Sequence, residues 1–161
     1  MTKLEVSYYS KFIGYISLLA IISAYVIEYI LGHQPCNLCL IERIPYILSL
    51  IILLINYKFK IIEKYLFLFL IIVFFFSLLI SIYHFGIEQD FFKESIVCAT
   101  DNSNNTLTKE QLLQELQKKT VSCKDVTFRI FGFSLTTINI LISLLLMIMS
   151  VKIFIYYAKK K

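Results

Sequence analysis

The amino-acid sequence predicts an all-α integral membrane protein, a bundle of four transmembrane helices. Its 161 residues are 58% hydrophobic with a mean hydropathy of +0.76, whereas soluble domains are about 45–50% apolar. The apolar residues come in blocks of about twenty, the length that a helix needs to cross the hydrocarbon core of a bilayer. These blocks lack the alternating pattern of membrane β-strands. We therefore expect a single membrane domain over residues 1–161.

Four apolar segments are long enough to be spans, at residues 12–31, 40–59, 65–84 and 130–155. We expect the first to be a retained helix, because it is long and lacks the small-residue cleavage site of a signal peptide. The second contains Pro45, which either begins the helix or kinks it.

The basic residues predict the orientation of the spans. Lysines gather near the N-terminus, in the turn 58–64 and at the C-terminus, and such clusters stay on the cytoplasmic side. We expect both termini in the cytoplasm and two loops outside, at about residues 32–39 and 85–129. The net charge of +5 follows from this placement, so we expect no nucleic-acid binding.

The second outer loop contains a pattern for one short helix. Thr108 and Gln111 form a capping box ahead of a leucine-rich stretch that ends near Lys118 and Lys119. The apolar side of this helix is suited to the membrane surface, to a protein partner or to the bundle itself.

All four cysteines lie in the two expected outer loops. Cys36 and Cys39 form a C-x-x-C pair, and Cys98 and Cys123 lie in the long loop. An even number of thiols on an oxidising face favours two disulfides. A four-sulfur zinc site is the alternative, but the second pair is widely separated where such sites usually have a second C-x-x-C. We therefore expect no metal site.

The two pairs differ in what a static disulfide would contribute. A bond between Cys98 and Cys123 would stabilise the folded state by roughly 3–4 kcal/mol in the chain-entropy model, because it closes a long loop. A bond between Cys36 and Cys39 removes little entropy, because its loop is so short. The C-x-x-C pair is better explained as a redox centre whose bond opens. A structural or assembly membrane protein with static disulfides remains an alternative.

If residues 36–43 are helical, their spacing places Cys36, Cys39 and Arg43 on one face of that helix. The start of a helix and a nearby guanidinium both favour a thiolate, the form that attacks disulfides and electrophilic acceptors. A location at the membrane boundary suggests a lipid-soluble electron acceptor. The alternative role for Arg43 is to anchor the helix at lipid headgroups.

The segment 35–43, P-C-N-L-C-L-I-E-R, resembles the signature of the bacterial disulfide bond formation protein B (DsbB) family. Four spans, a second outer cysteine pair and the segment F-R-I-F-G at 128–132 extend the resemblance over nearly the whole chain. The family often has tryptophan at the position of Phe128, so any contribution of an indole is absent here.

The resemblance implies a monomeric inner-membrane enzyme that reoxidises a periplasmic, thioredoxin-like DsbA-type protein and passes the electrons to the quinone pool. The quinone would be ubiquinone or menaquinone. By position, the partner would attack Cys98 of a Cys98–Cys123 disulfide. Cys123 would then exchange with the Cys36–Cys39 disulfide at Cys36, leaving Cys39 facing the quinone.

The resemblance also assigns two residues to the quinone. Arg43 and His84 occupy positions that resemble quinone-side residues of the family, and the alternative for His84 is an interfacial histidine. Glu42 matches the motif without a role that the sequence explains. Two related enzymes remain as alternatives: a family member with one dedicated substrate, and a bundle of the vitamin-K-epoxide-reductase type, whose C-x-x-C usually opens the last span.

Overall fold

The computed structural model describes residues 3–58, 63–93, 98, 122–124, 129–130 and 132–159. Within these ranges it contains helices α1 (Lys3–Tyr25), α2 (Asn37–Lys58), α3 (Glu63–Glu88) and α5 (Leu135–Lys159), the π-helix η1 (Val26–Ile30), and strands β1 (Arg129–Ile130) and β2 (Phe133–Ser134). Four helices are long and apolar enough to cross a membrane, the first of them running through η1. The prediction of four helical spans is confirmed. The helix expected at 108–119 lies outside the described residues.

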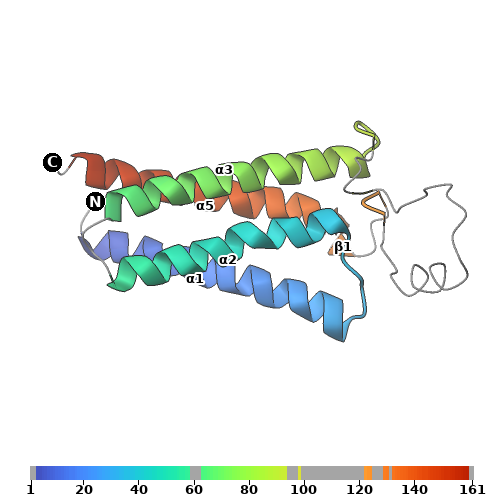
Figure 1. The fold of residues 1–161 in the computed structure, drawn as a ribbon, viewed down its shortest axis with the longest axis horizontal. Helices are drawn as coiled ribbons and strands as arrows, with labels where there is room; N and C mark the ends of the chain where they lie inside the picture. The colour runs from blue at the N-terminus through green and yellow to red at the C-terminus, as the bar shows by residue number, and fades with distance from the viewer. Residues whose placement is uncertain are drawn as a thin grey trace, which may run out of the picture.

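The four helices run side by side along the long axis of the molecule, as Figure 1 shows. Both termini lie at one end of the bundle, and β1 lies at the other end (Figure 1). We call the end that carries β1 the loop end. In a chain that spans a membrane, this arrangement brings both termini to the same side.

Two helices begin at positions other than the apolar pattern suggests. Helix α2 begins at Asn37, so its first turn includes Cys39. Helix α5 begins only at Leu135, because the apolar residues before it form the antiparallel pair β1–β2, with Ile130 opposite Phe133. Gly132, with a φ of 86°, permits the turn between these strands. The backbone N–H of Thr137 then bonds the Ser134 hydroxyl, which caps the start of α5.

Helix α2 continues through Pro45 to Lys58. The proline ring has no N–H, so the carbonyl of Ile41 loses its usual helical donor. The proline does not separate Cys39 from Arg43, because both lie ahead of it in the same helix. The geometry that places these two side chains near each other is therefore intact.

The core of the bundle combines large apolar side chains with small hydroxyls. Ile13, Phe67 and Phe74 are fully buried among the helices. Serines are fully buried as well and bond across helix pairs: Ser49 donates to Ser17 at 2.8 Å, and the hydroxyls of Ser77 and Ser143 are 2.9 Å apart. Small side chains let membrane helices approach closely, and their hydroxyls link one helix to the next.

Candidate redox site

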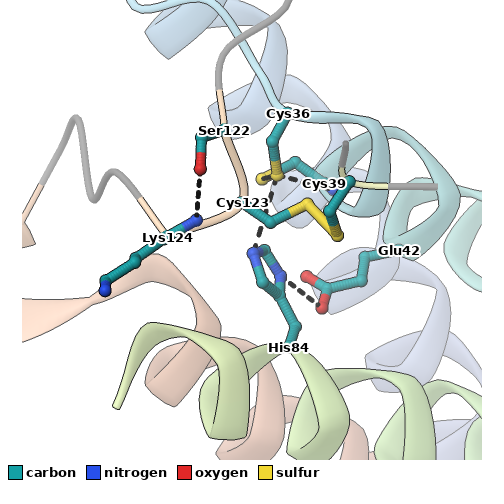
Figure 2. Close-up of a disulfide and its surroundings, with 8 residues drawn as sticks. Cys36, Cys39, Glu42, His84, Ser122, Cys123 and Lys124 are labelled. Carbon is teal, nitrogen blue, oxygen red and sulfur yellow. Dashed lines mark hydrogen bonds and ion pairs between the residues drawn. A yellow bond between two sulfur atoms is a disulfide. The ribbon is translucent and has the colours of Figure 1, made fainter. Parts of the chain in front are cut away.

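All four cysteines meet at the loop end of the bundle. Cys98 and Cys123 are joined by a disulfide, with a Cα–Cα distance of 5.4 Å. Both are buried in one apolar cluster with Cys36, and Cys39 packs against that cluster. Figure 2 shows Cys123 beside the C-x-x-C pair. The tertiary structure therefore brings together two pairs that are far apart in the chain.

Cys36 and Cys39 are free thiols at the start of α2. Their sulfurs are 2.7 Å apart, and the backbone N–H of Cys39 donates to Cys36 Sγ at 3.3 Å. The side-chain hydrogen bond from Cys39, helped by His84, lowers the pKa of Cys36 to about 5, although burial acts in the opposite direction. Cys36 is therefore a thiolate at neutral pH.

His84 on α3 connects the sulfur of Cys36 to a buried carboxylate. Its Nε2 lies 3.6 Å from Cys36 Sγ, and its Nδ1 lies 3.1 Å from Glu42 Oε1 on α2. His84 is only 2% exposed and Glu42 only 8%. A carboxylate at Nδ1 keeps the proton on that nitrogen and leaves Nε2 for the sulfur. Glu42, whose role the sequence left open, orients the histidine.

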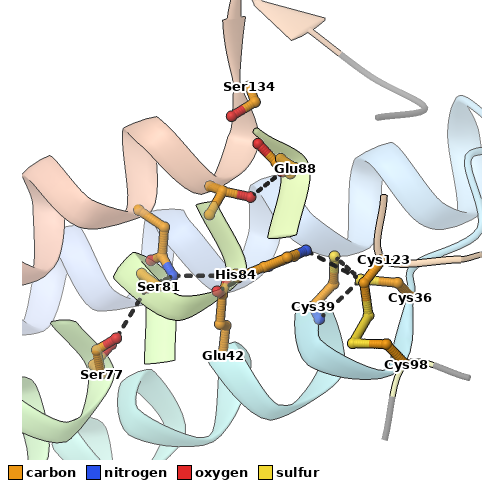
Figure 3. Close-up of polar contacts among 12 residues, drawn as sticks. Cys36, Cys39, Glu42, Ser77, Ser81, His84, Glu88, Cys98, Cys123 and Ser134 are labelled. Atoms are coloured by element: carbon orange, nitrogen blue, oxygen red, sulfur yellow. Dashed lines mark hydrogen bonds and ion pairs between the residues drawn. A yellow bond between two sulfur atoms is a disulfide. The ribbon is translucent and has the colours of Figure 1, made fainter. Parts of the chain in front are cut away.

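Asn139 on α5 holds Glu42 in place. Its Nδ2 donates to Glu42 Oε2 at 3.0 Å and to the Ser81 hydroxyl at 2.8 Å, while its Oδ1 accepts the hydroxyl of Tyr46. Figure 3 follows the polar groups from Ser77 and Ser81 past His84 to the cysteines. Sequence analysis missed Asn139 and Tyr46. An amide within an apolar span was the available signal, because polar groups at membrane depth are costly and usually functional.

Arg43 has two partners from the first span. Its Nη1 donates to Glu28 Oε2 at 2.5 Å, and its guanidinium lies over the Tyr25 ring at 5.2 Å from the centroid. The side chains of Arg43 and Glu28 are only 13% and 21% exposed. Glu28 belongs to η1, and such π-helical turns often occur at functional sites.

A cavity of about 390 Å³ joins these groups. Its polar part is lined by Cys36, Cys39, Glu42, Arg43, His84 and Cys123. Aliphatic side chains of α1, η1 and α5 line the rest, among them Leu19, Ile27, Ile138 and Ile142. Ligand sites for small molecules usually have this size and this combination of an apolar wall with a few polar groups. The residues fit an apolar molecule that carries hydrogen-bond acceptors at one end.

Glu88 also lines this cavity, next to the start of α5. Its Oε1 accepts the hydroxyl of Thr136, whereas its Oε2 is buried and has no hydrogen-bond partner among the residues that the structure describes. Sequence analysis did not single out this carboxylate. It adds a hydrogen-bonding group to the cavity wall.

Each residue that sequence analysis assigned to the site lies at the cavity or in the cysteine cluster. Cys36, Cys39, Cys123, Arg43 and His84 line the cavity. Cys98 reaches it only through its disulfide with Cys123, which belongs to the same cluster. Three donor atoms, from Cys36, Cys39 and His84, also lie within 4.8 Å of one another, close enough to share a metal ion.

Comparisons with known proteins point to one family. The family model described as "Disulfide bond formation protein DsbB" matches residues 9–153. The chain is also similar to a protein of Rickettsia prowazekii (strain Madrid E), named "Uncharacterized protein RP370". The two are 30% identical over 135 residues, which cover 83% of this chain and 78% of the relative. No solved structure matches the chain.

Proposed function

Because the chain belongs to the DsbB family of disulfide bond formation proteins, we propose that it is a protein-dithiol:quinone oxidoreductase. It reoxidises a periplasmic dithiol protein of the DsbA type and passes two electrons to a quinone. Disulfide formation in exported proteins depends on this supply of oxidant. One observation carries the proposal: both cysteine pairs pack together at a cavity that Arg43 and His84 also line.

The first exchange takes place at Cys98 and Cys123. A thiolate of the partner attacks Cys98 Sγ, forming a mixed disulfide and releasing Cys123 as a thiolate. Cys123 then attacks Cys36 of an oxidised Cys36–Cys39 pair, and Cys39 leaves as a thiolate. Cys123 and Cys36 belong to the same buried cluster, which supports this second exchange.

Two further exchanges complete the transfer. The partner's second thiol attacks its own sulfur in the mixed disulfide, so that the partner departs oxidised and Cys98 is released. Cys98 then attacks Cys123, restoring the Cys98–Cys123 disulfide and releasing Cys36 as a thiolate. The two electrons now reside on Cys36 and Cys39.

The residues of the C-x-x-C end have separate tasks. The low pKa of Cys36, about 5, makes it a good leaving group in the last exchange. His84 Nε2 lies where it accepts the proton of Cys36, and Glu42 stabilises the charge that the ring then carries. Re-formation of the Cys36–Cys39 disulfide would release the two electrons to an acceptor in the cavity, which both sulfurs line.

The cavity residues fit a quinone. A bound quinone supplies an acceptor for two electrons and two protons. The guanidinium of Arg43 would hold its polar ring, because it presents N–H groups to carbonyl oxygens. The imidazole of His84 would lie beside that ring, since it lines the same cavity. The aliphatic side chains of α1 and α5 would contact its apolar part.

The location that goes with this function is the bacterial inner membrane, with the cysteines on the periplasmic side. Lysines gather at the end of the chain's spans that lies away from the cysteines, and the positive-inside rule assigns such an end to the cytoplasm. A periplasmic site also places the Cys98–Cys123 disulfide in the same compartment as an exported partner, where disulfides persist.

The test is electron transfer in detergent solution. Purified protein, a quinone and a reduced dithiol partner should lower the absorbance of the quinone, and Cys36→Ser and Cys39→Ser should abolish this change. Tyr57→Phe is the control, since Tyr57 is 85% exposed near the other end of α2. Quinone reduction that continues in both cysteine variants would refute the proposal.

A measurement in cells addresses the alternative of static disulfides. Thiol alkylation should show Cys36 and Cys39 reduced when respiration stops and oxidised when it runs. Four sulfurs that stay oxidised under both conditions would instead indicate a structural protein.

A further inference from the structure

We propose that the reduced Cys36–Cys39 pair and His84 bind a thiophilic divalent cation such as Zn²⁺, and that the bound ion blocks formation of the Cys36–Cys39 disulfide. Sequence analysis weighed only a four-cysteine zinc site, because nothing in the sequence places His84 beside the C-x-x-C pair. The binding itself does not depend on the proposed quinone reaction.

The spacing of two donors already suits a tetrahedral ion. Zinc bonds of about 2.3 Å to sulfur and about 2.0–2.1 Å to nitrogen place the two ligand atoms about 3.6 Å apart. The distance from Cys36 Sγ to His84 Nε2 is 3.6 Å. Helices α2 and α3 therefore hold two of the ligands at the required separation.

The third donor needs a small movement. Two sulfurs on one zinc ion lie about 3.8 Å apart in tetrahedral geometry, whereas Cys36 Sγ and Cys39 Sγ are 2.7 Å apart. Cys39 lies at the cavity, so its side chain has room to turn away from Cys36 by about 1 Å, the difference that this geometry requires. The fourth position faces the same cavity, where a water molecule can complete the coordination.

Glu42 and Asn139 give His84 the hydrogen-bonded support that a metal-binding histidine usually has. Metal-binding histidines usually donate their second ring N–H to a carboxylate, which fixes the tautomer and makes the ligand nitrogen more basic. Glu42 Oε1 is that acceptor at Nδ1, and Asn139 holds the other oxygen of Glu42. The carboxylate also offsets part of the charge of the ion.

Binding and disulfide formation exclude each other. A metal ion requires thiolates, and its binding displaces any thiol protons that remain on Cys36 and Cys39. A Cys36–Cys39 disulfide has no thiolate to offer. Conversely, two sulfurs held on one ion cannot bond to each other.

The experiment uses the full chain in detergent, without quinone or partner. Protein reduced with a phosphine is titrated with Zn²⁺ against a chromogenic chelator, and with Cd²⁺, whose bonds to thiolates absorb in the ultraviolet. We expect one ion per reduced chain and none after oxidation with diamide. Cys36→Ser, Cys39→Ser and His84→Ala should each weaken binding more than tenfold, and Glu42→Gln should weaken it by about 10–100-fold.

His33→Ala is the matched control. His33 also lines the cavity but is not among the three clustered donors, so its replacement should leave the zinc affinity unchanged. Equal losses in His33→Ala and His84→Ala would overturn the proposal. Equal binding by reduced and oxidised protein would also overturn it, since the ion would then be held elsewhere on the surface.

A second measurement tests whether bound zinc prevents formation of the Cys36–Cys39 disulfide. Diamide should oxidise Cys36 and Cys39 at least tenfold more slowly when zinc is bound, as followed by alkylation and mass spectrometry. An unchanged rate would refute the proposal even if zinc binds. Because this oxidant replaces the quinone, failure here would not affect the proposed electron transfer.

Discussion

Glu42 and His84, on α2 and α3, are joined by a 3.1 Å contact between a carboxylate oxygen and Nδ1, and this contact decides which ring nitrogen faces Cys36. The carboxylate occupies Nδ1, so Nε2 is the atom left for the sulfur. Glu42, the motif residue next to Arg43, therefore influences the Cys36 sulfur through His84.

This relationship predicts the pH dependence of Cys36. Its thiolate persists down to a pKa of about 5, so the alkylation rate of the reduced protein should fall only as the pH drops through that value. His84→Ala removes two interactions that lower this pKa, and the midpoint should move toward higher pH. Alkylation with iodoacetamide between pH 4 and 9, read by mass spectrometry, measures the shift. His33→Ala should keep the original midpoint.

Asn139 should contribute to stability through the groups it satisfies. Asn139→Leu leaves the hydroxyl of Tyr46 and Oε2 of Glu42 without this partner, and each buried unsatisfied group costs about 1–3 kcal/mol. We expect a clear loss of thermal stability in detergent. Asn56→Leu is the control, because Asn56 Oδ1 has no hydrogen-bond partner within the described part of the chain and its loss should cost little. Equal melting temperatures for the two variants would contradict this account of Asn139.

Glu28 should hold Arg43 at the cavity wall. Glu28→Ala leaves a largely buried guanidinium without its carboxylate, and we expect a loss of about 1–3 kcal/mol, less than for a fully buried pair. The displaced Arg43 should also raise the KM for quinone. In a double-mutant cycle, Glu28→Ala combined with Arg43→Ala should cost less than the sum of the single changes. Additive losses would mean that the two residues act separately.

Cys123→Ser should reveal the partner. Cys98 then has no internal thiol to resolve a bond with an exported protein, so a mixed disulfide should accumulate in cells. Mass spectrometry of the trapped species distinguishes a DsbA-type oxidase from a single dedicated substrate. The Cys98→Ser, Cys123→Ser double variant should trap nothing, and a species trapped in both variants would assign the first attack to another cysteine.

The apolar pattern was sufficient for the four spans. A bilayer core demands about twenty apolar residues per helix, and that demand is local in sequence. Helical spacing likewise predicts that the C-x-x-C pair and Arg43 lie close together, and all three residues line one cavity. The start of α5 was wrong by pattern alone, because Ile130 and Phe133 are as apolar as the helix that follows and their pairing depends on a turn at Gly132.

Only the tertiary structure decided which residues complete the site. Cys123 and Cys36 share one buried cluster, and Asn139 on α5 bonds Glu42 on α2, although the members of each pair are distant in the chain. Such contacts depend on how the helices rotate and approach, which single-sequence periodicity does not specify. The sequence by itself determined the bundle of four long apolar helices and led us to expect redox chemistry at its thiols. Packing decided that Glu42, Asn139 and Glu28 hold His84 and Arg43 in place, because only packing brings those partners within hydrogen-bonding distance.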